Sequence, residues 1–192
     1  RGLRIEAAGS IFVNAPVLQN SFGGDTKPNA VDLEFIAGLG AGAGNVSFGA
    51  SIDTGGGRLT MRGQSLSGAA LVQVITAGGA IEGVFTGALG SSGSDFVTSG
   101  GPFSLTLSGG GAFNWIVTTS GGLIDLNAGA AGAVLTVNGR LDARLGVGGG
   151  SVSVSAANGT LSVPAAGALQ SGPAGAITAR ALNGVSIGGT VS

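Results

Sequence analysis

The stretch GSVSVSAANGTLSVPA, residues 150–165, contains twice the pattern that decides the fold: glycine, then alternating apolar and polar residues, then alanine. Alternation with a period of two is typical of a β-strand with one buried face, because successive side chains point to opposite faces of a sheet. Similar units, beginning with Gly and ending with Ala or Gly, recur at residues 9–15, 44–50, 57–63 and 122–128. No segment has apolar residues at helical spacing, so the sequence predicts an all-β fold.

The spacing of these units favours a parallel β-solenoid. The first apolar residue advances by 13 positions from Val46 to Leu59 and again from Leu59 to Val72, while Leu105 and Ile124 are 19 positions apart. Two or three such strands would make a coil of about 20 residues, as in other repeat proteins. Glycine supplies the tight corners that a solenoid needs at strand ends. We therefore expect residues 1–192 to form a single elongated β-helix.

The alternative is an antiparallel sandwich or barrel, which also has short alternating strands. The pairs Asn138-Gly139, Asn158-Gly159 and Asn183-Gly184 resemble two-residue hairpin turns. Hairpin pairing of strands 150–156 and 159–165 would contradict the solenoid, in which each strand pairs with the coils before and after it. The solenoid prediction also assigns a set of inward-facing side chains. They are Ile11, Val13, Val46, Phe48, Leu59, Met61, Ile124, Leu126, Val152, Val154, Leu161 and Val163.

Composition excludes several classes of protein. The 41 glycines do not indicate disorder, because the mean hydropathy is +0.50, and they do not indicate collagen, because there are only 5 prolines. A net charge of −1 without a basic run gives no electrostatic basis for binding nucleic acid. The long uncharged stretches, residues 96–124 and 145–179, are too broken by Gly, Ser, Asn and Pro to be membrane-spanning helices. The sequence therefore predicts a folded chain with neither a nucleic-acid partner nor a membrane span.

Units such as GSVSVSAANGTLSV, residues 150–163, resemble the repeat shaft of filamentous-haemagglutinin-type exoproteins, which are exported by two-partner secretion; autotransporter passengers look similar. The resemblance covers most of residues 9–192. It implies a right-handed β-helix placed outside the cell or at the bacterial cell surface, with a role in adhesion or in a surface matrix. The Asn-Pro-Asn-Gly-Ile secretion motif of that family is absent, so the resemblance extends to the shaft alone.

Two segments interrupt the repeating pattern. Residues 19–29 are polar and rich in Gly, and residues 87–101 are rich in Ser and Gly. Both are typical of loops that leave a coil. At the other extreme, residues 176–192 keep the strand pattern throughout, and the pattern begins again near Leu3. We therefore expect coil ends that can accept further strands, either from the same chain or from another copy.

The residues available for chemistry are few. The chain has no His, Cys or Tyr, which removes His-based catalytic sites and the usual zinc sites. Asp32 and Glu34 share one face of a strand, close to Asp25 in the expected loop. Paired carboxylates can hydrolyse glycosides or bind calcium, so these three are the candidate metal or catalytic residues. The alternative is that this face simply points to solvent.

Phe113 and Trp115 are the candidate contact residues for a ligand or for assembly. They lie on the same side of an expected strand, where two aromatic rings could stack on a sugar. The alternative is that both rings pack in the core or between subunits, because Ile116 on the opposite side leaves the buried face ambiguous.

Together these observations predict a structural shaft or filament subunit that assembles by β-strand stacking, is not an enzyme and holds no cofactor. Its partners would be further copies or coils of itself. The alternatives are an adhesin segment that binds cell-surface or matrix ligands, with its site in the excursion at residues 19–29, and a polysaccharide-active enzyme on the same fold.

Overall fold

A computed structural model describes residues 2–18, 30–39, 43–87, 89–90, 94–144, 146 and 149–192. This part of the chain contains strands, turns and bends and no helix. Every strand pair within it is parallel. The fold is therefore a β-solenoid, as predicted.

Each coil contributes one strand to each of two eight-stranded sheets. The first long sheet consists, in order, of β1 (Gly2–Ala7), β4 (Asp32–Ala37), β7 (Leu59–Gly63), β10 (Ile81–Phe85), β12 (Phe103–Leu107), β15 (Ile124–Ala128), β18 (Val152–Ala156) and β21 (Ile177–Ala181). The second consists of β3 (Val17–Leu18), β6 (Ile52–Asp53), β9 (Gln73–Ile75), β11 (Asp95–Val97), β14 (Ile116–Thr118), β17 (Arg140–Asp142), β20 (Ala168–Gln170) and β23 (Thr190–Val191).

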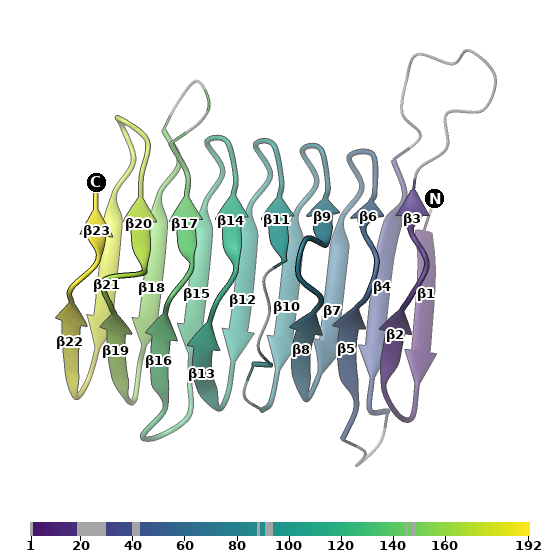
Figure 1. The fold of residues 1–192 in the computed structure, drawn as a ribbon, viewed down its shortest axis with the longest axis horizontal. Helices are drawn as coiled ribbons and strands as arrows, with labels where there is room; N and C mark the ends of the chain where they lie inside the picture. Colours follow the sequence, from purple (N-terminus) through teal and green to yellow (C-terminus); the bar gives the residue numbers. More distant parts are fainter. Residues whose placement is uncertain are drawn as a thin grey trace.

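Two shorter sheets follow one another along a third face (Figure 1). One consists of β2 (Ile11–Val13), β5 (Asn45–Phe48) and β8 (Ser65–Gly68), and the other of β13 (Gly110–Phe113), β16 (Val134–Val137), β19 (Thr160–Val163) and β22 (Gly184–Ile187). In Figure 1 the more distant strands of the first long sheet run downwards and the nearer strands run upwards, while successive coils advance from right to left. This path is right-handed.

The two strands that could have formed a hairpin test the fold directly. β18 pairs with β15 and β21, and β19 pairs with β16 and β22. The Asn158-Gly159 pair therefore turns the chain at a corner between two different sheets. The antiparallel alternative is wrong.

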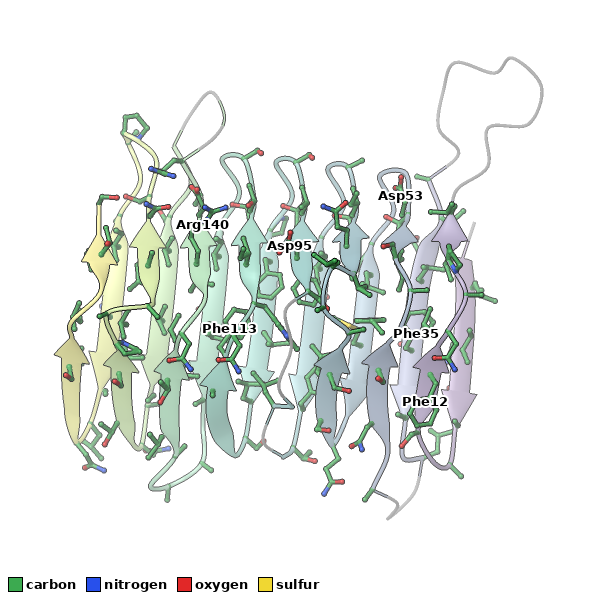
Figure 2. All side chains as sticks on the ribbon, in the orientation of Figure 1. Phe12, Phe35, Asp53, Asp95, Phe113 and Arg140 are labelled. Carbon is green, nitrogen blue, oxygen red and sulfur yellow. The ribbon has the colours of Figure 1, made fainter. Side chains whose placement is uncertain are left out.

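The core lies between the sheets and is filled by alternate residues of every strand. All twelve side chains predicted to face inward are buried. Phe35 and Phe113 lie between the sheets in Figure 2, and Phe12, on the outward side of β2, is 65% exposed. Burial of one face and exposure of the other is the direct result of the two-residue period.

The coil length differs from the expectation. The register partners Leu59, Ile81, Phe103 and Ile124 are 22, 22 and 21 positions apart. Leu105 pairs with Leu126 and not with Ile124, so the 19-residue spacing was not a coil period. Each complete coil has three strands, and the expected length of about 20 residues was short because the corner residues were undercounted.

Of the two expected loops, residues 19–29 lie outside the described residues. The second, residues 87–101, is corrected in part: it contains β11, which pairs with β9 and β14. Phe96 of this strand is buried in the core. The Ser- and Gly-rich composition hid a three-residue strand, because so short a strand needs only one inward side chain.

A four-residue turn of sequence Thr-x-Gly-Gly forms one corner in four successive coils. It occupies residues 54–57, 76–79, 98–101 and 119–122. In each turn the buried threonine hydroxyl donates a hydrogen bond to the carbonyl of the last glycine, at 2.6 Å for Thr54 and Thr119. The bond satisfies a polar group that the fold has buried.

The two glycines of this turn have separate physical roles. The first has φ between 101° and 112° in all four turns, for example 112° at Gly100, a region that other L-residues rarely adopt. The second leaves no room for a side chain: a Cβ on Gly101 would lie 2.3 Å from the carbonyl oxygen of Gly79 in the preceding coil. Stacking at the spacing of hydrogen-bonded strands therefore requires glycine at this second position.

Candidate functional site

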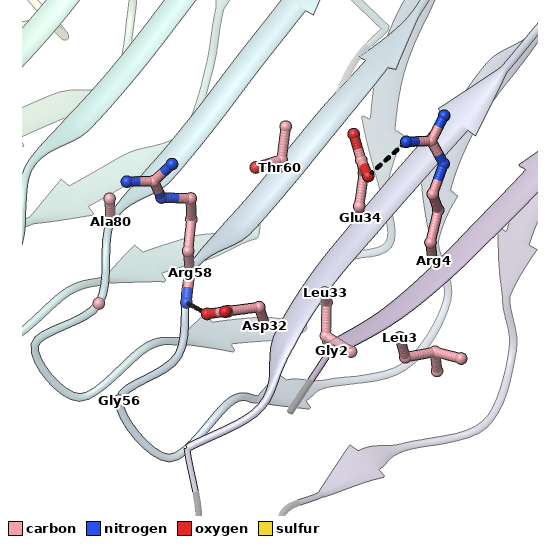
Figure 3. A pocket seen from close by; sticks show the side chains of 11 residues that line it. Gly2, Leu3, Arg4, Asp32, Leu33, Glu34, Gly56, Arg58, Thr60 and Ala80 are labelled. Carbon is pink, nitrogen blue, oxygen red and sulfur yellow. Dashed lines mark hydrogen bonds and ion pairs between the residues drawn. The ribbon is translucent and has the colours of Figure 1, made fainter.

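The candidate carboxylates Asp32 and Glu34 line a pocket of about 760 Å³ on the outward face of the first long sheet, at its N-terminal end (Figure 3). The pocket spans β1, β4 and β7 and the corner that follows β9. It is lined by Gly2, Leu3, Arg4, Asp32, Leu33, Glu34, Gly56, Arg58, Thr60, Gly79 and Ala80. The prediction that Asp32 and Glu34 share one face is confirmed, and that face points outward.

Both carboxylates have partners inside the protein. Asp32 Oδ1 accepts a hydrogen bond of 2.8 Å from the backbone N–H of Arg58, and Glu34 accepts one of 3.1 Å from the Arg4 guanidinium. Arg4 also pairs with Glu6, and this hydrogen bond, with the charge of Glu34, raises the pKa of Arg4. The side chains of Arg4, Glu6 and Glu34 are between 31% and 57% exposed. The arrangement is a surface ion-pair network.

The third carboxylate of the expected site, Asp25, lies outside the described residues. Among the residues that are described, no group of three or more Asp, Glu, His or Cys side chains could hold a metal ion. The part of the chain with defined structure also lacks any helix long and apolar enough to cross a membrane.

Phe113 and Trp115 are core residues, with 0% and 1% of their surface exposed. Their rings pack at a centroid distance of 5.3 Å, and Trp115 also contacts Phe96 at 5.2 Å. The expectation that they contact a sugar or another subunit is wrong, because neither ring reaches the surface. Alternation placed the two residues on one face correctly but did not reveal that this face is the inner one.

An ion pair that the sequence analysis missed lies at the corner after β17. The carboxylate of Asp142 is nearly buried and accepts two hydrogen bonds from the Arg144 guanidinium, at 2.8 and 3.0 Å. These bonds, with a further bond from the Arg144 backbone N–H and the charge of Arg140, hold the pKa of Asp142 below its ordinary value against the opposing effect of burial. The local sequence Arg-Leu-Asp-Ala-Arg, residues 140–144, was the available signal.

The two ends of the solenoid are the other candidate site. β1 and β21 are the outer strands of the first long sheet, β3 and β23 are those of the second, and β2 and β22 end the short sheets. Each of these strands has a single neighbour within the described structure. Outer strands present unpaired N–H and C=O groups that can add a further strand.

Apolar side chains that belong to the inward rows are exposed at both ends. At the N-terminal end, Ile5 is 38% exposed, although its register partner Phe35 is buried. At the C-terminal end, Val185 and Ile187 are 43% and 45% exposed, although they continue the rows of the buried Leu161 and Val163. Each end therefore presents a cross-section of the hydrophobic core together with the edges of three strands.

No family model, curated protein or solved structure matches this chain. The β-solenoid class therefore rests on the parallel strand pairing described above.

Proposed function

We propose that this chain is a structural shaft or filament segment of a secreted bacterial surface protein, and that it assembles by adding coils to its open ends. The observation that carries the proposal is the exposure of inward-row residues at both ends, where unpaired strand edges lie beside them. Exposed apolar surface that coincides with free strand edges is typical of a surface that another β-structure covers.

The outward faces support a structural role. Among the described residues, the outward positions of β12, β15 and β18 carry Ser104, Thr106, Asp125, Asn127, Ser153 and Ser155. These short side chains form a regular and mostly uncharged surface. The absence of Cys and the resemblance to exported shafts support placement outside the cell or at its surface.

The alternatives have less support. The pocket at Asp32 and Glu34 would be the site of a polysaccharide-active enzyme, but both carboxylates are already held by internal partners. An adhesin segment was expected to use residues 19–29, which lie outside the described residues. The shaft is therefore the function that we propose.

The proposal is tested by measuring the mass of the 192-residue chain by light scattering at rising concentration. We expect growing assemblies, and we expect the double substitution Val185→Lys and Ile187→Lys to abolish them, because two charges would then lie on the exposed core at one end. A matched control, Ser153→Lys with Ser155→Lys, puts the same charges on the outward face of a middle strand. A chain that stays monomeric at high concentration would refute assembly by stacking.

A further inference from the structure

The first and last coils have identical spacing. In the first coil the inward row residues are Leu3, Ile5, Ala7, Ile11, Val13 and Val17. In the last coil they are Ile177, Ala179, Ala181, Val185, Ile187 and Val191. Each residue of the second set follows its counterpart by 174 positions. No insertion or deletion separates the two coils from strand to strand.

Such agreement does not follow from the fold. From the last inward residue of the first long sheet to the first of the next strand, the end coils span four positions, as from Ala7 to Ile11. In the second coil the same corner, from Ala37 to Val46, spans nine. An end coil with a longer corner would carry its second and third strands at different places on the cross-section.

On this basis we propose that the C-terminal end of one copy binds the N-terminal end of a second copy, head to tail, with β21, β22 and β23 pairing in parallel with the partner's β1, β2 and β3. The inference rests on the proposed function and specifies its register: Ile177 opposite Leu3, Val185 opposite Ile11 and Val191 opposite Val17. The first coil of one copy then occupies the place of a next coil on the other, and the exposed inward rows become continuous.

Charge on the outward face agrees with this register. Glu6 and Arg180 are also 174 positions apart, and they are the first and last members of one outward row, related through the strand pairings of the first long sheet. Arg180 is exposed and has no ion-pair partner among the described residues. The head-to-tail junction places its guanidinium beside the carboxylate of Glu6 in the next copy.

A tail-to-tail contact fits less well. It turns one cross-section over, and because strands of the three faces differ in length, at most one sheet could then align with itself. It would also bring two Arg180 side chains to the same edge. Head-to-tail contact is the arrangement that pairs all three strands at once.

One position limits the junction. In the second long sheet the residue before the inward one donates its N–H to the preceding coil, as Thr190 does to the carbonyl of Gly167 at 3.1 Å. The first coil has Pro16 at this position, and proline has no N–H. We therefore expect the pairs β21–β1 and β22–β2 to provide most of the binding, and β23–β3 the least.

Engineered cysteines test the register, because the chain has none of its own. Phe12 and Ser186 lie on outward positions of β2 and β22 and would be direct partners across the junction, at the separation of about 4.8 Å between neighbouring strands. This distance is within the reach of a disulfide. Mixing Phe12→Cys with Ser186→Cys chains under oxidising conditions should give a covalent dimer that contains one of each.

Each control removes one explanation. Ser186→Cys mixed with Asn14→Cys, two residues along the first coil, should cross-link at least about tenfold less, because the added distance of about 7 Å exceeds disulfide reach. Each single variant alone should give no dimer at early times. Dimers of Ser186→Cys alone, or equal yields from the Asn14→Cys mixture, would overturn the register even if the assemblies seen by light scattering form.

A charge exchange provides the second test. Arg180→Glu should weaken association about threefold to tenfold at low salt, as expected for an exposed ion pair turned repulsive. Combining it with Glu6→Arg should restore much of the association. If the double variant associates no better than Arg180→Glu alone, the two side chains are not neighbours and the register is wrong. Complete failure of the unmodified chain to associate would instead refute the proposed function itself.

Discussion

Two groups of coils make the same corner by different means. In the four coils with corners at residues 54–57, 76–79, 98–101 and 119–122, a threonine hydroxyl bonds the carbonyl of the closing glycine. In the next coil the corner begins at Ala143, which has no hydroxyl, and the Asp142–Arg144 ion pair lies beside it. The closing glycine remains: a Cβ on Gly150 would lie 2.4 Å from the carbonyl oxygen of Gly122. The hydrogen bond is replaceable, whereas the close approach of the backbones is not.

Placing a methyl group in the glycine row should therefore have the largest effect. Gly101→Ala puts a Cβ 2.3 Å from a backbone oxygen, which no side-chain rotation can relieve. We expect a loss of about 3 kcal/mol or more in the free energy of unfolding. The measurement is urea unfolding followed by the fluorescence of Trp115, the only tryptophan.

Gly129→Ala is the matched control for this substitution. A Cβ there would have no heavy atom within 4 Å, and Gly129 is not among the glycines with positive φ. Its stability should be unchanged or slightly raised, because alanine restricts the unfolded chain. If the two alanine variants unfold at the same urea concentration, the stacking argument is wrong.

Removing one corner hydroxyl should have an intermediate effect. Thr98→Val keeps the shape of the buried side chain but deletes the hydrogen bond to the Gly101 carbonyl. We expect a loss of about 1–2 kcal/mol in the same unfolding measurement. Thr106→Val, on the outward face of β12, is the control and should change the stability by less than about 0.5 kcal/mol. A Thr98→Val protein as stable as the unmodified chain would mean that the hydroxyl makes no net contribution.

The ion pair of the second group should contribute less, and its contribution should depend on pH. Because the folded state lowers the pKa of Asp142 below its ordinary value of 3.8, the stabilisation is fully present above that value. It is lost as the pH falls through the lower pKa of the folded state. Asp142→Asn should therefore cost about 1 kcal/mol at pH 7, allowing for the partly exposed Arg144.

Urea unfolding at about pH 7 and at about pH 2 separates this charge effect from a change in shape. The gap between Asp142→Asn and the unmodified protein should narrow at the lower pH, and Arg180→Gln, which removes an exposed and unpaired guanidinium, should show no gap at pH 7. A gap of constant size at both pH values would show that the carboxylate charge is not what stabilises this corner.

The smallest effect is expected at the pocket, on the outward face. Replacing Asp32 by Asn and Glu34 by Gln together should change the stability by less than about 0.5 kcal/mol, because the ion pair is exposed and the Asn oxygen can still accept the Arg58 N–H. The fold and any adhesive property should stay nearly unchanged. Polysaccharide turnover that is present in the unmodified chain and absent in this double variant would show that the shaft hypothesis had overlooked an enzyme.

The sequence allowed the strands to be predicted better than the corners. Alternation places Val152 and Val154 inside whatever the neighbours are, because the two-residue period is a property of one strand alone. Coil length depends on how many residues each corner contains, and this number varies along the chain. The threonine at positions 54, 76, 98 and 119, at steps of 22, 22 and 21, was the signal that would have given the period of these coils.

The candidate site was harder to predict for a different reason. Which face of the strand with Phe113 and Trp115 is buried depends on the sheets opposite, not on the residues themselves, and the aromatic cluster joins rings from several coils. The exposure of Ile5 and Val185 depends in the same way on where the coil stack ends. Both are properties of packing between coils, which a single strand does not encode.

The variable corners determine how such a protein can change over time. Coils differ in length by whole corner segments, whereas the strands of the first long sheet keep their register from β1 to β21. Losing one residue inside a strand would exchange the buried and exposed faces of the rest of that strand, whereas gaining residues at a corner leaves the stack intact. A gene for this chain can therefore acquire sequence in only two harmless ways, as a decoration at a corner or as an entire coil. Duplicating residues 81–102, one coil of the shortest class, would lengthen the particle by about 4.8 Å and leave the rest of it unchanged.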